Sequence, residues 1–481
     1  MVISDFGSMN AAPGLPRPAV PGPVRRWSRR WIAAASAQAP LRWTPMVADS
    51  PSPMQVARAM CSWQDRQLMF LVAFGMTGEV INFGCRLNGF ESEAMAELID
   101  DDRMVVINSC AVTSEASRQV RQTIRKLRRE RPEARIVVTG CGADIETAEY
   151  EAMEEVNAVL LNGSKFQPEL AKKDGVVGHM ARDHGAIHDG PMARQAHARA
   201  HLEVQNGCNH SCTFCIIPTG RGAARSVPPR QVVAKVKKLV ALGHGEVVLT
   251  GVDLTSYGED IGPHMRLGHL VAAILEDVPE LPRLRLSSID AIELDDLLFE
   301  LVTKEPRIMP HLHLSLQSGD NMILKRMKRR HQRNEAIDLC QMLKAARPSI
   351  ALGADLIAGF PTETEEMFAN TLALVDECAL DLLHVFPFSP RHGTPAAKMP
   401  QLHGSVVKER AARLRALATI RSQKFHEGLV GGAGHAIVEK DGEARLENFA
   451  RVVFEGDAKR GEIMKLAITD AAHDHVKGIL L

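Results

Sequence analysis

The chain has 481 residues, in which 58 lysines and arginines balance 58 aspartates and glutamates. This balance excludes a protein that bulk positive charge holds on nucleic acid, although a local basic patch remains compatible with it. No apolar run approaches the roughly 18 residues of a membrane helix, and nine irregularly spaced cysteines do not form a secreted disulfide framework. We therefore predict a cytoplasmic protein that does not associate with membranes and in which some cysteines are ligands.

The first 75 residues differ in composition from the rest. They contain all four tryptophans, nine of the 26 prolines, and eight arginines against three acidic residues. The run APGLPRPAVPGPV at 12–24 holds too many prolines for a helix or a central strand. We predict that residues 1–75 are a disordered or mis-annotated extension and that the functional chain starts at Met76. A transit peptide is the alternative.

From Met76 onward, short β-rich runs alternate with helical ones. Strands are expected at 79–83, 104–108 and 135–139, and helices around 91–99 and 114–130. This alternation predicts a parallel sheet, and ligands bind at the carboxyl edge of such sheets. One cysteine follows each strand, namely Cys85, Cys110 and Cys141. Three thiols at one edge indicate a cluster site, whereas the alternative is three cysteines that pack as small hydrophobes.

The helix at 114–130 is rich in basic side chains. Arg121 and Arg125 on this helix are candidate contacts to RNA phosphates, which would give salt-dependent affinity. The alternative is an ordinary solvated face on which these arginines pair with nearby glutamates. The two interpretations differ in what the guanidinium groups contact.

A second group of cysteines follows residues 171–200, which are predicted to be a linker. The run VQNGCNHSCTFCIIP at 204–218 holds Cys208, Cys212 and Cys215 in the spacing C-x3-C-x2-C. Three thiolates this close together suit three irons of a [4Fe–4S] cluster, whose fourth iron is then open to the amino and carboxylate groups of S-adenosylmethionine. A zinc site that takes His210 as its fourth ligand is the alternative.

The remaining chain alternates strands and helices. Strands are expected to begin near residues 202, 246, 283, 311, 351 and 382, and helices lie at 230–242, 266–276, 293–303, 320–327 with 333–345, and 363–376. Six βα units predict a partial barrel of the TIM type, with its chemistry at the carboxyl ends of the strands.

These residues resemble the radical S-adenosylmethionine superfamily and, within it, the methylthiotransferases. The motifs that carry the resemblance are FGCRLN at 83–88, NSCAVT at 108–113, TGCGA at 139–143, GCNHSCTFCIIP at 207–218, TGVDLTSYG at 250–258, RLSSID at 285–290, LSLQSG at 314–319, DLIAGFPTET at 355–364 and HVFPFSPR at 384–391. RLN after Cys85, GRGAARSVP at 220–228 and GVDLTSYG are similar to the MtaB-type group. The C-terminal stretch resembles a short TRAM domain, a small β-barrel that contacts RNA.

The resemblance implies an α/β fold in three parts. Residues 76–170 are expected to form an N-terminal parallel βαβ domain with an auxiliary cluster. Residues 201–428 are expected to form the partial (βα)6 radical S-adenosylmethionine barrel, and residues 429–481 the TRAM-like β-barrel.

The resemblance also implies a reaction, which is methylthiolation of C2 of N6-threonylcarbamoyladenosine at position 37 of tRNA. Two S-adenosylmethionine molecules and two [4Fe–4S] clusters are implied, one cluster on Cys208, Cys212 and Cys215 and the other on Cys85, Cys110 and Cys141. The expected partners are tRNA and an electron donor such as flavodoxin or ferredoxin, without DNA or a membrane. The alternatives are methylthiolation of a ribosomal protein side chain or of isopentenyladenosine in tRNA, and a non-enzymatic metal-binding RNA module.

Four further residues are expected to contact S-adenosylmethionine by the same resemblance. Gly251 and Val252 are expected along its methionine end, and Asp355 and Gly359 near its ribose and adenine. The alternatives are a tight turn at Gly251 and a strand cap at Asp355, because glycines at strand ends often serve only backbone geometry.

Two arginines beside the second cysteine group are candidates for RNA contact. Arg221 and Arg225 lie in GRGAARSVP, nearer to the expected chemistry than the helix at 114–130. Either guanidinium is a candidate bidentate partner for the carboxylate of the threonylcarbamoyl group.

Overall fold

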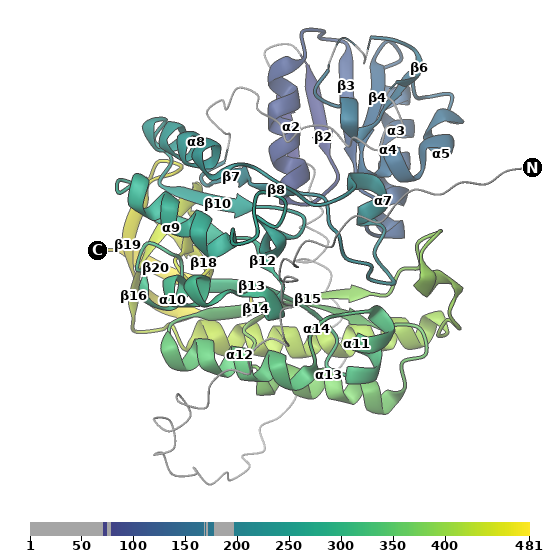
Figure 1. Cartoon of the computed structure of the whole chain (residues 1–481). Coiled ribbons are helices and arrows are strands. Elements are labelled where there is room, and N and C mark those ends of the chain that lie inside the picture. The colour runs from purple at the N-terminus through teal and green to yellow at the C-terminus, as the bar shows by residue number, and fades with distance from the viewer. Residues whose placement is uncertain (1–70, 75–77, 168, 170–171, 178–196) are drawn as a thin grey trace, which may run out of the picture. The chain divides into compact units, whose positions relative to one another are not determined.

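The structure is a computed structural model of the chain, and it describes residues 71–74, 78–167, 169, 172–177 and 197–481 (Figure 1). The extension predicted at 1–75 therefore lies outside the described residues, except for 71–74. None of the helices in the described part of the chain is both long enough and apolar enough to span a bilayer.

The N-terminal part is a sheet of six strands in the order β1-β2-β3-β4-β5-β6. Strand β1 is antiparallel to β2, and the other neighbours are parallel. The strands are β1 (Leu71–Phe74), β2 (Glu79–Asn82), β3 (Met104–Ser109), β4 (Arg135–Gly140), β5 (Ala158–Leu160) and β6 (Gly175–Val177). The helices are α2 (Arg86–Leu98), α3 (Ser114–Glu130), α4 (Cys141–Ile145) and α5 (Thr147–Glu151). The predicted parallel sheet is confirmed.

Two edge strands correct the expectations for the flanking segments. Strand β1 falls inside the predicted extension, and β6 falls inside the predicted linker at 171–200. Both are only three or four residues long, and so short a run shows no measurable alternation of apolar and polar residues.

Helix α3 shows why the local sequence folds as predicted. The Thr113 hydroxyl caps the helix by accepting a hydrogen bond from the backbone N–H of Ala116 at 3.1 Å. Val120, Ile124 and Leu127 repeat at helical spacing and are buried on one face. This face packs on the sheet and fixes the position of the loop between β3 and α3.

A chain that begins at Met76 tests the role of β1. We expect it to fold and to retain as much iron as the longer chain, because β2 keeps its parallel pairing with β3 when the antiparallel edge strand is removed. The loss should be about 1–3 kcal/mol, the net contribution of a few backbone hydrogen bonds. Urea unfolding compares it with a chain that begins at Met69 and keeps β1. Insolubility or loss of iron only in the shorter chain would contradict this expectation.

The central part is built from parallel strands in two sheets, β11-β10-β7 and β12-β13-β14-β15. The strands are β7 (Ala200–Glu203), β10 (Glu246–Thr250), β11 (Arg283–Leu286), β12 (Ser288–Ile289), β13 (His311–Gln317), β14 (Ala351–Ala358) and β15 (Leu382–Pro387). Only Ser287 separates β11 from β12, so the chain contributes six successive wall segments. The predicted partial (βα)6 barrel is confirmed.

Helices follow the barrel strands in turn. They are α8 (Pro229–Ala241), α9 (Leu267–Asp277), α10 (Asp296–Lys304), α11 (Asn321–Met327), α12 (Arg333–Ala346), α13 (Glu365–Glu377) and α14 (Gly404–Glu427). The apolar faces of these helices other than α11 share one buried core with the strands, whereas Ile323 and Met327 of α11 belong to a separate small cluster. This core includes Cys340 and Cys378, which are fully buried among aliphatic side chains.

The C-terminal part is a closed barrel in the order β16-β17-β18-β20-β19, as the resemblance implies. Its strands are β16 (Ala433–Lys440), β17 (Glu443–Leu446), β18 (Arg451–Phe454), β19 (Ile463–Ala471) and β20 (Val476–Leu480). It has its own small apolar core.

Candidate active site

The loop of Cys208, Cys212 and Cys215 lies between the short strand β8 (Gln205–Asn206) and helix α7 (Ile217–Arg221). The backbone N–H of Cys215 donates to the carbonyl of Cys212 at 3.1 Å, which closes a tight turn over these two cysteines, while the backbone N–H of Cys208 donates to the carbonyl of Gly222 at 3.0 Å. The guanidinium of Arg329 lies 3.7 Å from the Cys212 sulfur. The loop therefore presents three half-buried thiols, one of them next to a positive charge.

The electrostatics of these thiols suit a bound cation. Burial, reinforced by the carboxylate of Asp253, raises the pKa of Cys208 to about 12. Burial also raises the pKa of Cys215 to about 11. A thiolate is therefore costly here unless a metal shares its charge, and iron supplies that charge in a cluster. The donor set of three sulfurs on one short loop fits three irons of a cubane.

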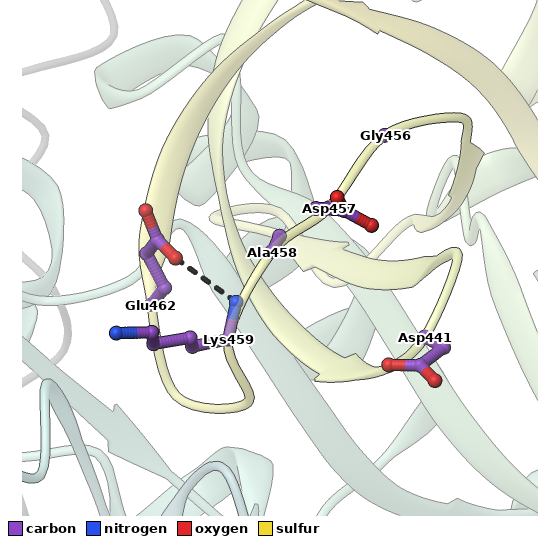
Figure 2. A pocket seen from close by; sticks show the side chains of 6 residues that line it. All are labelled: Asp441, Gly456, Asp457, Ala458, Lys459 and Glu462. Carbon is purple, nitrogen blue, oxygen red and sulfur yellow. Dashed lines mark hydrogen bonds between the residues drawn. The ribbon is translucent and has the colours of Figure 1, made fainter.

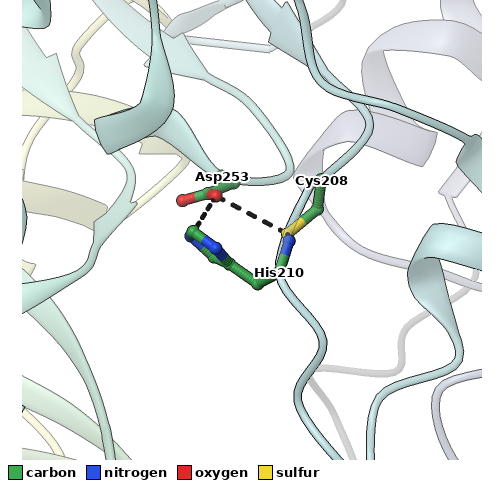
Figure 3. A group of neighbouring side chains, drawn as sticks. All are labelled: Cys208, His210 and Asp253. Atoms are coloured by element: carbon green, nitrogen blue, oxygen red, sulfur yellow. Dashed lines mark hydrogen bonds and ion pairs between the residues drawn. The ribbon is translucent and has the colours of Figure 1, made fainter. Parts of the chain in front are cut away.

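The side chain of His210 pairs with Asp253 (Figure 3). Its Nε2 lies 2.7 Å from an Asp253 carboxylate oxygen, and the Cys208 sulfur lies 3.5 Å from the same oxygen. At this loop, the compact group of possible ligand atoms is Cys208, His210 and Asp253, without Cys212 or Cys215. The zinc alternative requires His210 together with all three thiols, and the geometry does not provide this set.

The second group of cysteines lies at the carboxyl edge of the N-terminal sheet. Cys85 follows β2, Cys110 follows β3 directly, and Cys141 begins α4 directly after β4. Burial raises the pKa of Cys110 to about 12, with further contributions from the negative charges of Cys141 and Cys85. The three cysteines follow the neighbouring strands β2, β3 and β4, so they lie at one edge of the sheet. Arg221, at the end of the helix that follows Cys215, donates to the Cys141 sulfur at 3.1 Å, so the two groups lie on elements in contact.

The residues expected to contact S-adenosylmethionine are spread over two strand ends and one strand interior. Gly251 and Val252 follow β10, and a Cβ on Gly251 would lie 2.9 Å from the amide oxygen of Gln205. Gly359 follows β14 with φ +76°, where a Cβ would lie 2.8 Å from Val407. Both positions therefore favour glycine, because a side chain there would crowd Gln205 or Val407, whatever else these glycines contact.

Asp355 lies within β14, so the alternative of a strand cap is wrong. Its carboxylate is 2.9 Å from Nε2 of His313 and 3.3 Å from Nδ1 of His384. Although burial alone would raise it, these histidines hold the pKa of Asp355 well below its usual range. Neither histidine was singled out by the sequence, because their positions in the β-rich runs at 311–317 and 382–387 do not show that both side chains meet Asp355.

Comparison with known proteins supports what the geometry indicates. The Radical SAM superfamily matches residues 202–375, and Uncharacterized protein family UPF0004 matches residues 78–162. The chain is 45% identical over 410 residues to "Threonylcarbamoyladenosine tRNA methylthiotransferase MtaB" of Rickettsia prowazekii (strain Madrid E), an alignment that covers 84% of this chain and 97% of the relative. The chain belongs to the radical S-adenosylmethionine methylthiotransferase family. It is thus an enzyme that uses a [4Fe–4S] cluster and S-adenosylmethionine.

Two further relatives show the breadth of this methylthiotransferase family. The protein of the same name from Bacillus subtilis (strain 168) is 36% identical, over 82% of this chain and 94% of the relative. "tRNA-2-methylthio-N(6)-dimethylallyladenosine synthase" of Zymomonas mobilis subsp. mobilis is 33% identical, over 83% of this chain and 96% of the relative.

Arg221 corrects the expectation of an RNA contact in this methylthiotransferase. Its side chain is only 3% exposed and makes a two-pronged ion pair with Glu91, at 2.8 and 3.0 Å. It also donates to the Asn88 amide oxygen at 2.7 Å, and its Nε donates to the Cys141 sulfur at 3.1 Å. Its donors are occupied inside the protein, so it contacts neither RNA nor a substrate carboxylate.

The other candidate RNA contacts also have protein partners. Arg225 donates to the backbone carbonyls of Arg221 and Ala223. Arg121 forms ion pairs at 2.9 and 2.8 Å with two glutamates, Glu146 and Glu149. Arg125 lies 3.9 Å from Glu155 and remains half exposed. The alternative of a solvated, ion-paired face therefore describes Arg121 better than RNA binding does.

A surface pocket on the C-terminal barrel is acidic (Figure 2). Its lining residues are Asp441, Gly456, Asp457, Ala458, Lys459 and Glu462. The Glu462 carboxylate accepts a hydrogen bond from the backbone N–H of Lys459 at 3.0 Å. Three carboxylates outnumber one ammonium in this lining, so its charge disfavours contact with phosphates.

Proposed function

We propose that this chain methylthiolates C2 of N6-threonylcarbamoyladenosine, beside the anticodon of tRNA at position 37. The observation that carries the proposal is the alignment at 45% identity over nearly the whole length of a relative of that name. Two groups of three thiols on elements linked by Arg221 support it, since one group is suited to generating a radical and the other to supplying sulfur. The proposed partners are tRNA and an electron donor such as flavodoxin or ferredoxin.

The cysteines have separate tasks in this proposal. Cys208, Cys212 and Cys215 hold a [4Fe–4S] cluster, and Cys85, Cys110 and Cys141 hold a second one. When bound together, the first cluster and S-adenosylmethionine supply the one-electron chemistry that the C2–H bond of adenine requires, because this bond is not acidic enough for a general base. A second S-adenosylmethionine supplies the methyl group.

The rest of the site binds, orients and excludes water. Gly251 and Val252 lie at the carboxyl end of β10, close to the loop of Cys208, where a cofactor chelated at the cluster must pass. Asp355 is kept ionised by two histidines, so it accepts hydrogen bonds from ribose hydroxyls without changing its protonation state. Arg221 ties the loop of the first cluster to Cys141 of the second.

Substrate competition tests the assignment. We expect methylthio product on tRNA that carries N6-threonylcarbamoyladenosine, and a rate at least about 100-fold lower on tRNA that carries isopentenyladenosine. The reason is that a site built to pair polar groups is left with unpaired groups when the substrate lacks them. Nucleoside mass spectrometry of the digested tRNA measures both products. Product on isopentenyladenosine or on a ribosomal protein, and none on threonylcarbamoyladenosine, would place the chain in another branch of the family.

A further inference from the structure

Arg86 is a cation without a carboxylate partner. It follows Cys85 and begins α2 in the RLN motif. Its guanidinium carbon lies 5.5 Å from the ring centre of Phe449, which stands on the turn between β17 and β18. It makes no hydrogen bond or ion pair with any residue in the described part of the chain. Five N–H donors in a half-buried position therefore lack an acceptor from the protein.

Three more arginines surround the same ring. The guanidinium carbons of Arg199, Arg285 and Arg445 lie 5.3, 5.1 and 4.6 Å from the Phe449 ring centre. The backbone of Phe449 has φ +76°, a left-handed conformation that is unfavourable for a bulky residue. The turn places the Phe449 ring among four guanidinium groups, and the ring of His311 also stacks on it at 4.5 Å. An aromatic ring attracts such cations.

The carboxylates nearby do not neutralise this cluster. Arg199 and Arg445 share Glu439, at 2.6 and 2.9 Å, and Arg285 pairs with Glu246 at 2.7 Å. Nη1 of Arg285 is buried without any hydrogen-bond partner. Four guanidinium groups therefore meet two glutamates, and the excess positive charge lies where the low local dielectric screens it weakly.

This positive region lies where the turn between β17 and β18 of the C-terminal barrel meets the partial barrel. Arg285 is on β11, and its Nη2 lies 3.5 Å from the carbonyl oxygen of Leu446 at the end of β17. Asp355 of β14 is the acidic group whose charge acts on Arg86, and two histidines already hold it. Arg86 thus reaches from the cysteine edge of the N-terminal sheet to this junction, where an added anion would complete the charge balance.

We propose that Arg86 determines substrate specificity by binding the carboxylate of the threonylcarbamoyl group. The proposal rests on the proposed function and takes the place of Arg221, whose donors are occupied. The guanidinium and carboxylate match as a bidentate pair. Arg86 adjoins Cys85, so it holds the N6 substituent of the same base whose C2 meets the second cluster. An uncharged isopentenyl group leaves this guanidinium unpaired, which disfavours that substrate.

The experiment compares two anticodon stem-loop RNAs, one with the threonylcarbamoyl acid and one with its neutral threoninamide. Wild-type enzyme should prefer the acid by about 100-fold in kcat/KM. Arg86→Gln should abolish this preference by losing activity only on the acid. Arg86→Lys should retain part of the preference, because lysine offers the positive charge without the paired, planar N–H donors of a guanidinium group. Arg118→Gln, a surface arginine paired with Glu115, is the matched control and should behave as wild type.

Two further measurements separate the sources of the carboxylate. S-Adenosylmethionine also carries one, so its cleavage without RNA and its KM are measured in each variant, with iron and sulfide content. If Arg86→Gln raises the KM for S-adenosylmethionine equally with both RNAs, the carboxylate belongs to the cofactor and the proposal is wrong.

Equilibrium binding of the two RNAs distinguishes the remaining outcomes. Preference of wild type for the acid RNA, lost in Arg86→Gln, supports the site even if neither RNA is methylthiolated. Turnover of the acid with unchanged preference in Arg86→Gln refutes the site but supports the function.

Discussion

Replacement of Cys208, Cys212 and Cys215 together by alanine is expected to abolish cleavage of S-adenosylmethionine and to remove about four of about eight irons per chain. The three cysteines lie on one short loop between β8 and α7. Without the Cys208 thiol, the compact ligand group at this loop keeps only His210 and Asp253. Anaerobic reconstitution, iron analysis and detection of 5′-deoxyadenosine measure the two effects separately.

The complementary variant replaces Cys85, Cys110 and Cys141. It should also lose about four irons, keep the cleavage of S-adenosylmethionine, and make no methylthio product. The two variants therefore control for each other, because each keeps the cluster that the other lacks. Full methylthiolation by this second variant would show that the N-terminal thiols do not hold a cluster needed for sulfur insertion.

The cysteines were predictable because their signal is local. Cys208, Cys212 and Cys215 are close in sequence, and the other three follow strands whose alternation with helices identifies the edge they share. A parallel sheet then brings those three together without any further information. The partial barrel was predictable because its helices show a local pattern and follow β-rich runs in regular alternation, although several of its strands are as short as β1.

The arginines were not predictable from local patterns. Arg221 was expected to face RNA because it lies beside the cysteine loop, but its partner Glu91 is 130 residues away and meets it only after folding. Arg86 belongs to the RLN motif after Cys85, which is similar to the MtaB-type group. Nothing in the sequence showed that its guanidinium would have no carboxylate as an ion-pair partner. Ion pairing between distant segments depends on tertiary structure, which propensity and spacing do not report.

Arg221→Gln is expected to destabilise the fold by about 3 kcal/mol and to alter the second cluster. Although burial alone would raise it, Arg221 and Lys165 lower the pKa of Glu91 to about 2, so this carboxylate is ionised inside the protein. Loss of Arg221 leaves Glu91 with Lys165, 2.5 Å away, as its remaining cation. A buried charge that loses a partner costs several kcal/mol, and the remaining lysine keeps the cost at the low end.

Arg221→Lys separates charge from geometry. A lysine keeps the positive charge near Glu91, but one ammonium cannot reproduce the planar fork together with the third contact to Cys141. We therefore expect near wild-type urea unfolding, with a changed electron paramagnetic resonance spectrum and reduction potential of the second cluster, because hydrogen bonds to the sulfurs tune such potentials.

Arg391 provides the matched control for Arg221. It is also buried, follows β15, and crosses to the N-terminal sheet by an ion pair of 2.5 Å with Glu146, without contact to a cysteine. Arg391→Gln should cost a similar amount of stability in urea and leave the spectra of both clusters unchanged. Equal spectral changes in the Arg391 and Arg221 variants would mean that Arg221 acts only by holding the two parts together. A change confined to the Arg221 variants would show that its N–H bond to the Cys141 sulfur sets the properties of the second cluster.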